Sequence, residues 1–371
     1  MSRFMLAHLQ DGRLGDAQIL KPETAKLMHS RLFALDDAAN AMAYGFYEES
    51  RNGHRIIGHG GDTVSFHSDL HLIPDAGVGF FVSYNSAGRG QISVRSILWD
   101  AFINRYFPTG PSNLPTLETA KNDAVAVAGT YLGSRRPEGS LFRIVALLGQ
   151  AKVSPNEDGT ISVDAFKDAN DKPKRWREVA PMTFRDVNGE DSIIFKPDYT
   201  GRMEMIIAFP FESFQRVGIL DNGKLVLTAA GLSLFIMLLT LVLWFVGWLV
   251  RRHYGGRLEL TAGETLLRYL VRLFFALDLV FVVALLVIVS YMSSNLDFFS
   301  DRGNTWVRVA QVIGLLGVIG TPIILYNAIQ AWISGRYRIW GKLQATIFAL
   351  ASLGFLWLVY AGNLLSFTSR F

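Results

Sequence analysis

Four long apolar segments constrain the fold of this chain more than any other feature. A helix needs about 20 mostly apolar residues to cross a bilayer. Four stretches meet that length, at about 225–250, 266–292, 306–333 and 343–366, and the first carries no charged residue. A buried core helix in a soluble protein is rarely so long or so uniformly apolar. The sequence therefore predicts an all-α membrane domain of four helices over residues 225–371.

Positive charges in the short loops predict how these helices are oriented. Lys and Arg gather after the first and third spans, and acidic residues prevail between the second and third. The loop residues are Arg251, Arg252 and Arg257, then Asp297, Asp301 and Arg302, and finally Arg336, Arg338 and Lys342. Because Lys and Arg favour cytoplasmic loops, both chain ends are predicted outside. Residues 1–224 are then extracytoplasmic, and we expect a bacterial inner or cell membrane, with the lipid bilayer as a partner.

Two ionisable residues and a stripe of small residues lie within the predicted spans. Asp278 and Arg308 are functional candidates because charged groups are rare at membrane depth. The simpler expectation is that Asp278 pairs with a neighbouring helix and that Arg308 reaches the outer interface. The small residues are Gly314, Gly317 and Gly320, followed by Pro322. This pattern favours close helix packing and a kink in the third span.

Composition limits the remaining function classes. The chain has 371 residues, which is too long for one ordinary domain. Its net charge is only +4 and its Lys and Arg residues are scattered or lie beside apolar segments, so nucleic-acid binding is not predicted. It contains no Cys, which excludes disulfides, a catalytic thiol and Cys-ligated metal sites.

The stretch "IIGHGGDTVSFHSDLHLIPDAGVGFFVSYNSAG", residues 56–88, alternates apolar runs with turn signals. Two alternating runs around "PDAG" predict a hairpin, and "HRIIGH" adds a third strand before a glycine-containing turn. Apolar residues at helical spacing predict a helix over about 91–106. The pattern indicates an antiparallel meander with flanking helices, and so an α+β region over residues 1–107.

Residues 44–88 resemble a family once this pattern is recognised. His59-Gly60-Gly61, together with its strands and turns and the upstream "ILKPET" phrase, is similar to the third-motif region of serine β-lactamase-like hydrolases. That family includes class C β-lactamases, penicillin-binding-protein-like peptidases and related esterases. The resemblance implies that residues 1–107 are the C-terminal part of a β-lactamase-like domain.

The resemblance also implies roles for four residues on the first strand. His59 would be the catalytic residue that tunes a nucleophile. Gly60 and Gly61 would leave room for a substrate acyl group, and the backbone N–H of Asp62 would be one oxyanion donor. The alternative from the residues alone is a tight glycine turn capped by His59. A peptidoglycan-type peptide or an ester is the implied substrate, through hydrolysis of an amide, ester or β-lactam bond.

The chain lacks two sequence motifs of that family. No Lys follows a Ser by three positions, so Ser-x-x-Lys is absent, and Tyr-x-Asn is absent as well. The first residues also lack the basic and apolar regions of a signal peptide. We therefore expect an upstream part to be missing and this chain to be inactive as written. The alternative is a non-catalytic membrane binding or scaffold protein derived from the family.

The second strand carries three side chains of the types that bind metals. His67, Asp69 and His71 alternate and so share one face, and His and Asp are good zinc ligands. Adjacent residues on one strand rarely close a tetrahedral site, however, and the solvated face of an antiparallel strand has the same pattern. We predict no metal and no cofactor.

The remaining segment, residues 108–224, contains a linker and a small β domain. Residues 108–124 are rich in Pro and polar residues, as in a linker. Residues 125–224 alternate between short strands and hairpin turns, which predicts a small antiparallel β domain in the form of an open barrel or a sandwich. Within it, residues 140–150 fit either a helix or a strand. Arg135 and Arg136 could bind an anion or lipid head groups, although a solvated loop is the simpler interpretation.

Overall fold

The computed structural model describes residues 1–63, 65–86, 93–110, 116–168, 170–256, 260–295 and 301–368. The chain forms two compact units. The first comprises residues 1–135 and 150–216, and the second comprises residues 136–149 and 217–371. Arg257 and Asp297, which contributed to the predicted orientation, lie outside the described residues.

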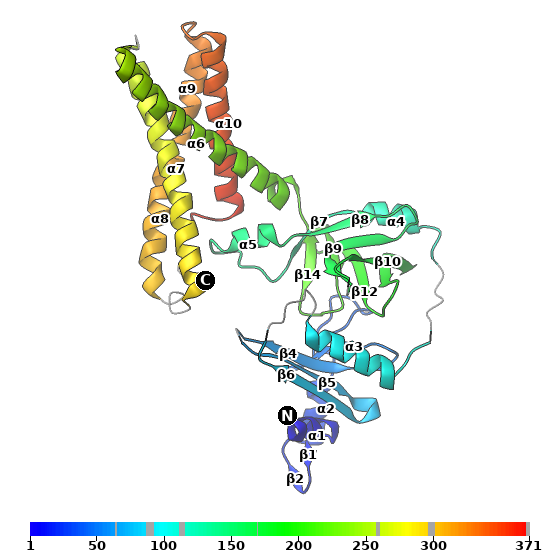
Figure 1. Ribbon diagram of the computed structural model, residues 1–371. Helices are drawn as coiled ribbons and strands as arrows, with labels where there is room; N and C mark the ends of the chain where they lie inside the picture. The colour runs from blue at the N-terminus through cyan, green and yellow to red at the C-terminus, as the bar shows by residue number, and fades with distance from the viewer. Residues whose placement is uncertain are drawn as a thin grey trace. The chain divides into compact units, whose positions relative to one another are not determined.

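The first unit begins with a four-stranded antiparallel sheet (Figure 1). Its strands pair in the order β3-β4-β5-β6, so the predicted three-stranded meander is present with one further strand, β3. The predicted glycine turn is wrong, because Gly60 and Gly61 lie within β4 and pair with Asp69 and Ser68. The bounds are β3 (Tyr47–Glu48), β4 (Ile57–Asp62), β5 (His67–Ile73) and β6 (Val78–Tyr84). A 3₁₀ turn, η1 (Pro74–Ala76), joins the last two strands and ends at Gly77, whose φ of 65° is left-handed. Glycine adopts that conformation without strain.

Helices cover both faces of this sheet. Alternation along β5 sends Leu70 and Leu72 to one face, where Met5 and Met28 pack. It sends Ile73 to the other face, against Trp99 and other residues of the third helix. The helices are α1 (Ser2–Leu9), α2 (Pro22–His29) and α3 (Val94–Tyr106), and a short hairpin, β1 (Arg13–Leu14) and β2 (Ala17–Gln18), follows α1.

The rest of the first unit is a closed eight-stranded antiparallel barrel with strand order β10-β11-β12-β13-β14-β7-β8-β9. The strands are β7 (Gly129–Gly133), β8 (Ala151–Pro155), β9 (Ile161–Lys167), β10 (Pro173–Ala180), β11 (Thr183–Asp186), β12 (Ser192–Pro197), β13 (Met203–Ile206) and β14 (Ser213–Arg216). Tyr131, Phe184 and Phe195 fill its interior. The prediction of an open barrel or sandwich is corrected, because β14 pairs with β7 and closes the sheet. Closure removes the exposed sheet edges.

A short helix, α4 (Ala120–Val127), precedes the barrel and lies partly within the segment predicted as a linker. Its Ala124 and Val127 are buried in the barrel core. The hydroxyl of Tyr131 donates to the carbonyl of Val127 at 2.6 Å. The end of this helix is therefore fixed to the first barrel strand.

The second unit contains the predicted apolar helices (Figure 1). They are α6 (Gly223–Tyr254), α7 (Ala262–Ser294), α8 (Asp301–Ile319), α9 (Thr321–Ile333) and α10 (Ile339–Ala361). Four helical segments are long and apolar enough to cross a membrane, with α8 and α9 together forming the third. Many of their large apolar side chains are exposed, as lipid-facing residues would be. The chain is therefore a membrane protein by length and composition of its helices.

The third span breaks where the sequence predicted a kink. The last helical residue of α8 is Ile319, and α9 begins at Thr321 with Pro322 in its first turn. Proline cannot donate a backbone hydrogen bond to the preceding turn. The side chain of Arg308 is exposed.

Asp278 departs from its expected pairing. It is buried on α7, and among the described residues its Oδ1 has no hydrogen-bond partner. A side chain at Gly317 on α8 would overlap this oxygen, so the glycine leaves the space that the carboxyl group occupies. The predicted polar pairing between helices is replaced by close packing against a residue without a side chain.

Candidate functional site

Strand β4 holds the four residues that the sequence singled out. His59 is exposed, and its Nδ1 lies 2.9 Å from the carbonyl of Gly45. Because a carbonyl oxygen only accepts, Nδ1 carries a hydrogen, and in the neutral ring Nε2 is then an acceptor. The backbone N–H of Gly60 donates to the hydroxyl of Tyr47 at 2.6 Å. A side chain at Gly61 would meet nothing within 4 Å, so the strand is open there.

The carboxylate of Asp62 contacts two neighbouring side chains. Its Oδ1 lies 2.7 Å from His67 Nδ1, and its Oδ2 lies 2.8 Å from a guanidinium nitrogen of Arg95. The hydrogen bond from Arg95, followed by that from His67, keeps the pKa of Asp62 below its usual range. A guanidinium nitrogen of Arg95 also donates to the carbonyl of Ser68 at 2.9 Å. Arg95 therefore joins α3 to the two strands.

His71 is the centre of a buried ionic cluster under α3. Its ring is only 1% exposed and stacks on Trp99 at 3.8 Å between centroids. Its Nδ1 lies 2.7 Å from Glu49, and its Nε2 lies 3.6 Å from Asp69. Burial alone would lower the pKa of His71, but its ionic contacts with Asp69 and Glu49 outweigh it and raise the pKa to about 9.

This cluster corrects the prediction of a solvated strand face. His67, Asp69 and His71 do share one face of β5, but α3 covers it. Their side chains are engaged in ion pairs with Glu49, Asp62 and Arg95. Within the described part of the chain, no group of three or more His, Asp or Glu side chains has an arrangement that could hold a metal ion.

The raised pKa of His71 predicts how stability changes with pH. A cation stabilised in the folded state adds stability that is complete below the unfolded pKa of about 6.5 and is lost as pH rises through about 9. Amide protection of β5, corrected for intrinsic exchange, should therefore fall between pH 6.5 and 9.5 in hydrogen-exchange mass spectrometry. His71→Gln should have lower protection and a flatter pH profile. Parallel profiles for the two proteins would contradict the assignment to His71.

A large cavity of about 1880 Å³ lies within the first unit. Its lining contains nine Lys and Arg residues and nine Asp and Glu residues, so it is strongly polar without a large excess of either sign. Most of the basic residues already have acidic partners. These pairs include Lys174 with Asp186 and Asp191, Arg175 with Asp158, Arg185 with Glu190 and Arg51 with Asp100.

One side of the cavity is lined by aromatic rings and by Arg135. The rings of Tyr47 and His59 are 5.5 Å apart, and Tyr47 meets Phe211 edge-on at 5.1 Å. Phe209 stacks on Phe211 at 5.5 Å. The guanidinium of Arg135 lies 5.2 Å from the Phe211 ring. We call Tyr47, His59, Phe209, Phe211 and Arg135 the aromatic wall.

Arg135 is one of three basic residues of the cavity lining, with Lys172 and Arg177, that make no ion pair with a carboxylate among the described residues. Its neighbour is the face of an aromatic ring, and among the described residues no ion pair joins it to a carboxylate. Glu212 also lines the cavity; burial raises the pKa of its carboxyl, and the charge of Arg135 partly opposes that rise. The Arg135 guanidinium therefore keeps its capacity to bind a further anion.

Sequence reasoning singled out the two outer members of this wall and missed the aromatic residues between them. His59 was singled out by its neighbouring glycines, and Arg135 was considered as an anion ligand. Tyr47, Phe209 and Phe211 carried no signal, because isolated aromatic residues in strands and turns are normally core residues. Phe211 meets Tyr47, and through it the His59 strand, only because the barrel loop and the sheet belong to one compact unit.

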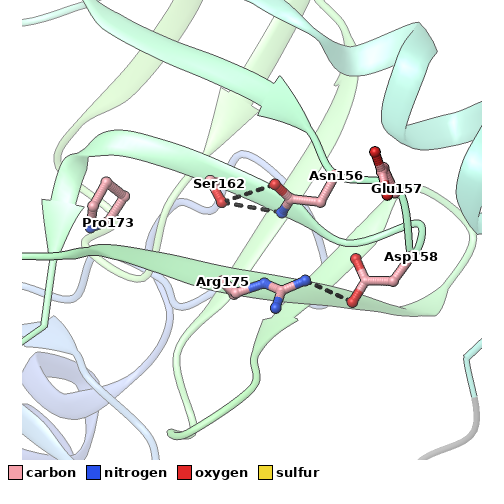
Figure 2. A pocket seen from close by; sticks show the side chains of 6 residues that line it. All are labelled: Asn156, Glu157, Asp158, Ser162, Pro173 and Arg175. Atoms are coloured by element: carbon pink, nitrogen blue, oxygen red, sulfur yellow. Dashed lines mark hydrogen bonds and ion pairs between the residues drawn. The ribbon is translucent and has the colours of Figure 1, made fainter.

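A second, smaller hollow of about 590 Å³ lies on the barrel at the β8–β9 turn. Figure 2 shows Asn156 facing Ser162 and Arg175 facing Asp158. Asn156 Nδ2 donates to Ser162 at 3.0 Å, and Arg175 donates to Asp158 at 2.6 Å. These contacts stabilise the turn and leave little capacity for a ligand.

Comparison with known proteins gives little information on function. No family model matches the chain, and no curated protein matches it. Two similar solved structures are "Crystal structure of SurE with D-Leu" and "Crystal structure of SurE". Each is 16% identical over 57% of this chain, with a TM-score of 0.33. The chain covers 49% and 47% of those proteins, which is about half of their length.

These findings correct the resemblance to serine β-lactamase-like hydrolases. No β-lactamase family model matches, and the first unit contains a closed eight-stranded barrel beside its four-stranded sheet. A His-x-Gly triplet between two turns is compatible with any antiparallel meander, which is why it was not decisive. The predicted family and its hydrolase activity are therefore wrong for this chain, and so is the derivation of a binding or scaffold protein from that family. The catalytic and oxyanion roles that the family implied for His59, Gly60, Gly61 and Asp62 have no independent support.

Proposed function

We propose that this chain is a membrane-anchored binding protein whose first unit takes up a small amphiphilic anion outside the cytoplasm. The orientation rests on loop charges. Arg251 and Arg252 end α6, and Arg336, Arg338 and Lys342 lie between or at the start of the later helices. Positive charge favours the cytoplasmic side. The start of α6, and the first unit that precedes it, then belong to the opposite side.

The aromatic wall is the observation that carries the choice of ligand. An apolar group would pack on Phe209, Phe211 and the Tyr47 ring, because aromatic surfaces favour stacked or edge-on contacts. A carboxylate or similar anion on the same ligand would pair with Arg135. A ligand with both groups satisfies the two features together, whereas a simple inorganic anion would use only the second.

His59 adds selectivity to this site. Its Nε2 can accept a hydrogen bond, because its Nδ1 donates to the carbonyl of Gly45. A hydroxyl or amide N–H on the ligand would supply that bond. The His71 cluster contributes indirectly, because it stabilises β5, which pairs with β4. Gly60 of β4 in turn donates to Tyr47. The wall is therefore attached to a rigid sheet.

Phenylacetate is the simplest probe of this proposal, since it combines a ring with a carboxylate. The full chain in detergent should bind it in a saturable calorimetric titration. Phenethylamine, which has the opposite charge, should not bind, and acetate should bind more weakly. A charge-assisted hydrogen bond contributes roughly 1.5–3 kcal/mol, so Arg135→Gln should weaken binding by about tenfold or more.

Arg202→Gln is the matched control for that variant. Arg202 is an exposed barrel arginine that bonds locally to Thr200 and does not line the cavity. It should bind phenylacetate as the wild type does. Equal losses in both variants, or binding of phenethylamine as tight as that of phenylacetate, would overturn the proposed ligand class.

A further inference from the structure

The connection between barrel strands β7 and β8 belongs to the membrane unit rather than to the barrel. Residues 136–149 group with the apolar helices. Within this connection, α5 (Arg143–Leu148) packs against α6. Leu141 and Leu147 are buried in the same core cluster as Val226 and Ala230 of α6. A hairpin connection of this length is longer than a strand pair requires, which indicates that it serves another purpose.

Polar contacts fix this connection to one end of the helical bundle. Arg143 pairs with Asp221, just before α6, at 3.2 Å and with Glu138 at 3.5 Å. The side chain of Asn363, just after α10, donates to the carbonyl of Glu138 at 3.1 Å. The segment is thus held where α6 begins and α10 ends, which is where two membrane spans reach the bilayer surface.

An aromatic side chain lies at the same end of the helical bundle. Trp357, in the last two turns of α10, donates its indole N–H to the carbonyl of Leu220 at 2.8 Å. Trp is enriched at the boundary between the hydrocarbon and the head groups, because its ring is apolar and its N–H is polar. The surroundings of α5 are therefore those of a membrane interface.

The outer face of α5 is apolar and uncovered within the described chain. Val145 is 55% exposed and Leu148 is 68% exposed, although both belong to the segment whose other face is buried among membrane helices. We propose that α5 is an interfacial membrane anchor, with Val145 and Leu148 inserted among lipids at the boundary of head groups and acyl chains. Lipid is the expected occupant because the face is part of the unit whose helices span the bilayer.

The absence of Cys in the chain makes site-directed spin labelling direct. Val145→Cys and Leu148→Cys would be labelled in the full chain, in phosphatidylcholine vesicles. Val125→Cys is the aqueous control, because Val125 is 66% exposed on α4 of the first unit. Leu238→Cys is the bilayer control, because Leu238 is exposed near the middle of α6. Accessibility to oxygen, which enters lipid, and to a water-soluble nickel chelate gives the depth of each label.

Labels at positions 145 and 148 should be more accessible to oxygen than to the nickel chelate, with a depth between the two controls. Chelate accessibility as high as that of the Val125→Cys label would place the face in water and overturn the proposal. Low accessibility to both reagents would mean that protein covers it, either a second copy or another partner, and would also overturn the proposal. Gel-filtration profiles like those of the wild type would show that each labelled chain is folded.

Discussion

Gly317→Leu should prevent the second unit from folding into a stable bundle. A side chain at this position would overlap the carboxyl group of Asp278, and its first carbon would lie 3.2 Å from the Asp278 backbone nitrogen. Flexible side chains can move aside, but the α7 backbone can do so only if the two helices separate. Overpacking usually costs 1–3 kcal/mol, and we expect about 3 kcal/mol or more here. Thermal unfolding in detergent, followed by gel filtration, would measure this loss.

Gly231→Leu is the matched control for this substitution. Gly231 also lies in a membrane span, on α6, but it is exposed and a side chain there would meet nothing within 4 Å. It should tolerate leucine with little change, because the new side chain faces lipid. A Gly317→Leu protein as stable as Gly231→Leu would show that α7 and α8 are not packed closely at this point.

Phe195→Ala should unfold the barrel or leave it marginally stable. Phe195 is buried on β12, with its ring 5.6 Å from Phe184 and 5.8 Å from Tyr131. Removing a buried phenylalanine side chain typically costs 3–5 kcal/mol, because a cavity remains where the ring was. Limited proteolysis of the full chain would report the loss as rapid cleavage within residues 150–216.

Tyr199→Ala provides the comparison for this second substitution. Tyr199 lies in the hairpin just after β12 and is 99% exposed, so its removal should leave the cleavage rate unchanged. If Phe195→Ala resisted the protease as well as Tyr199→Ala does, the interior of the barrel would not be closely packed. The closed arrangement of its strands would then need revision.

The membrane helices were largely predictable from the sequence. Hydrophobicity over about 20 residues is a local property, so the four spans follow directly from composition along the chain. The break between α8 and α9 was predictable for the same reason, because Pro322 acts on its own helix. The meander of β4, β5 and β6 was predictable from alternation and from the Pro-Asp-Ala-Gly turn.

The candidate site was much less predictable, because it depends on contacts between distant segments. The alternation of His67, Asp69 and His71 placed them on one face, but whether α3 covers that face is a tertiary property. Barrel closure likewise depends on the pairing of β14 with β7, which are about 80 residues apart. The family resemblance failed for a related reason, since a short triplet in a common supersecondary pattern carries little specific information.

Mapping of a bound ligand would test the central proposal most directly. Phenylacetate at saturating concentration should slow hydrogen exchange in the peptides that contain Tyr47 and His59 and in the peptide that contains Phe209 and Phe211. Both regions should respond together, because the aromatic wall joins the sheet to the barrel, and Arg135→Gln should abolish the response. Saturable binding without slower exchange in both regions, or no binding at all, would contradict the proposal that this wall is a site for an amphiphilic anion.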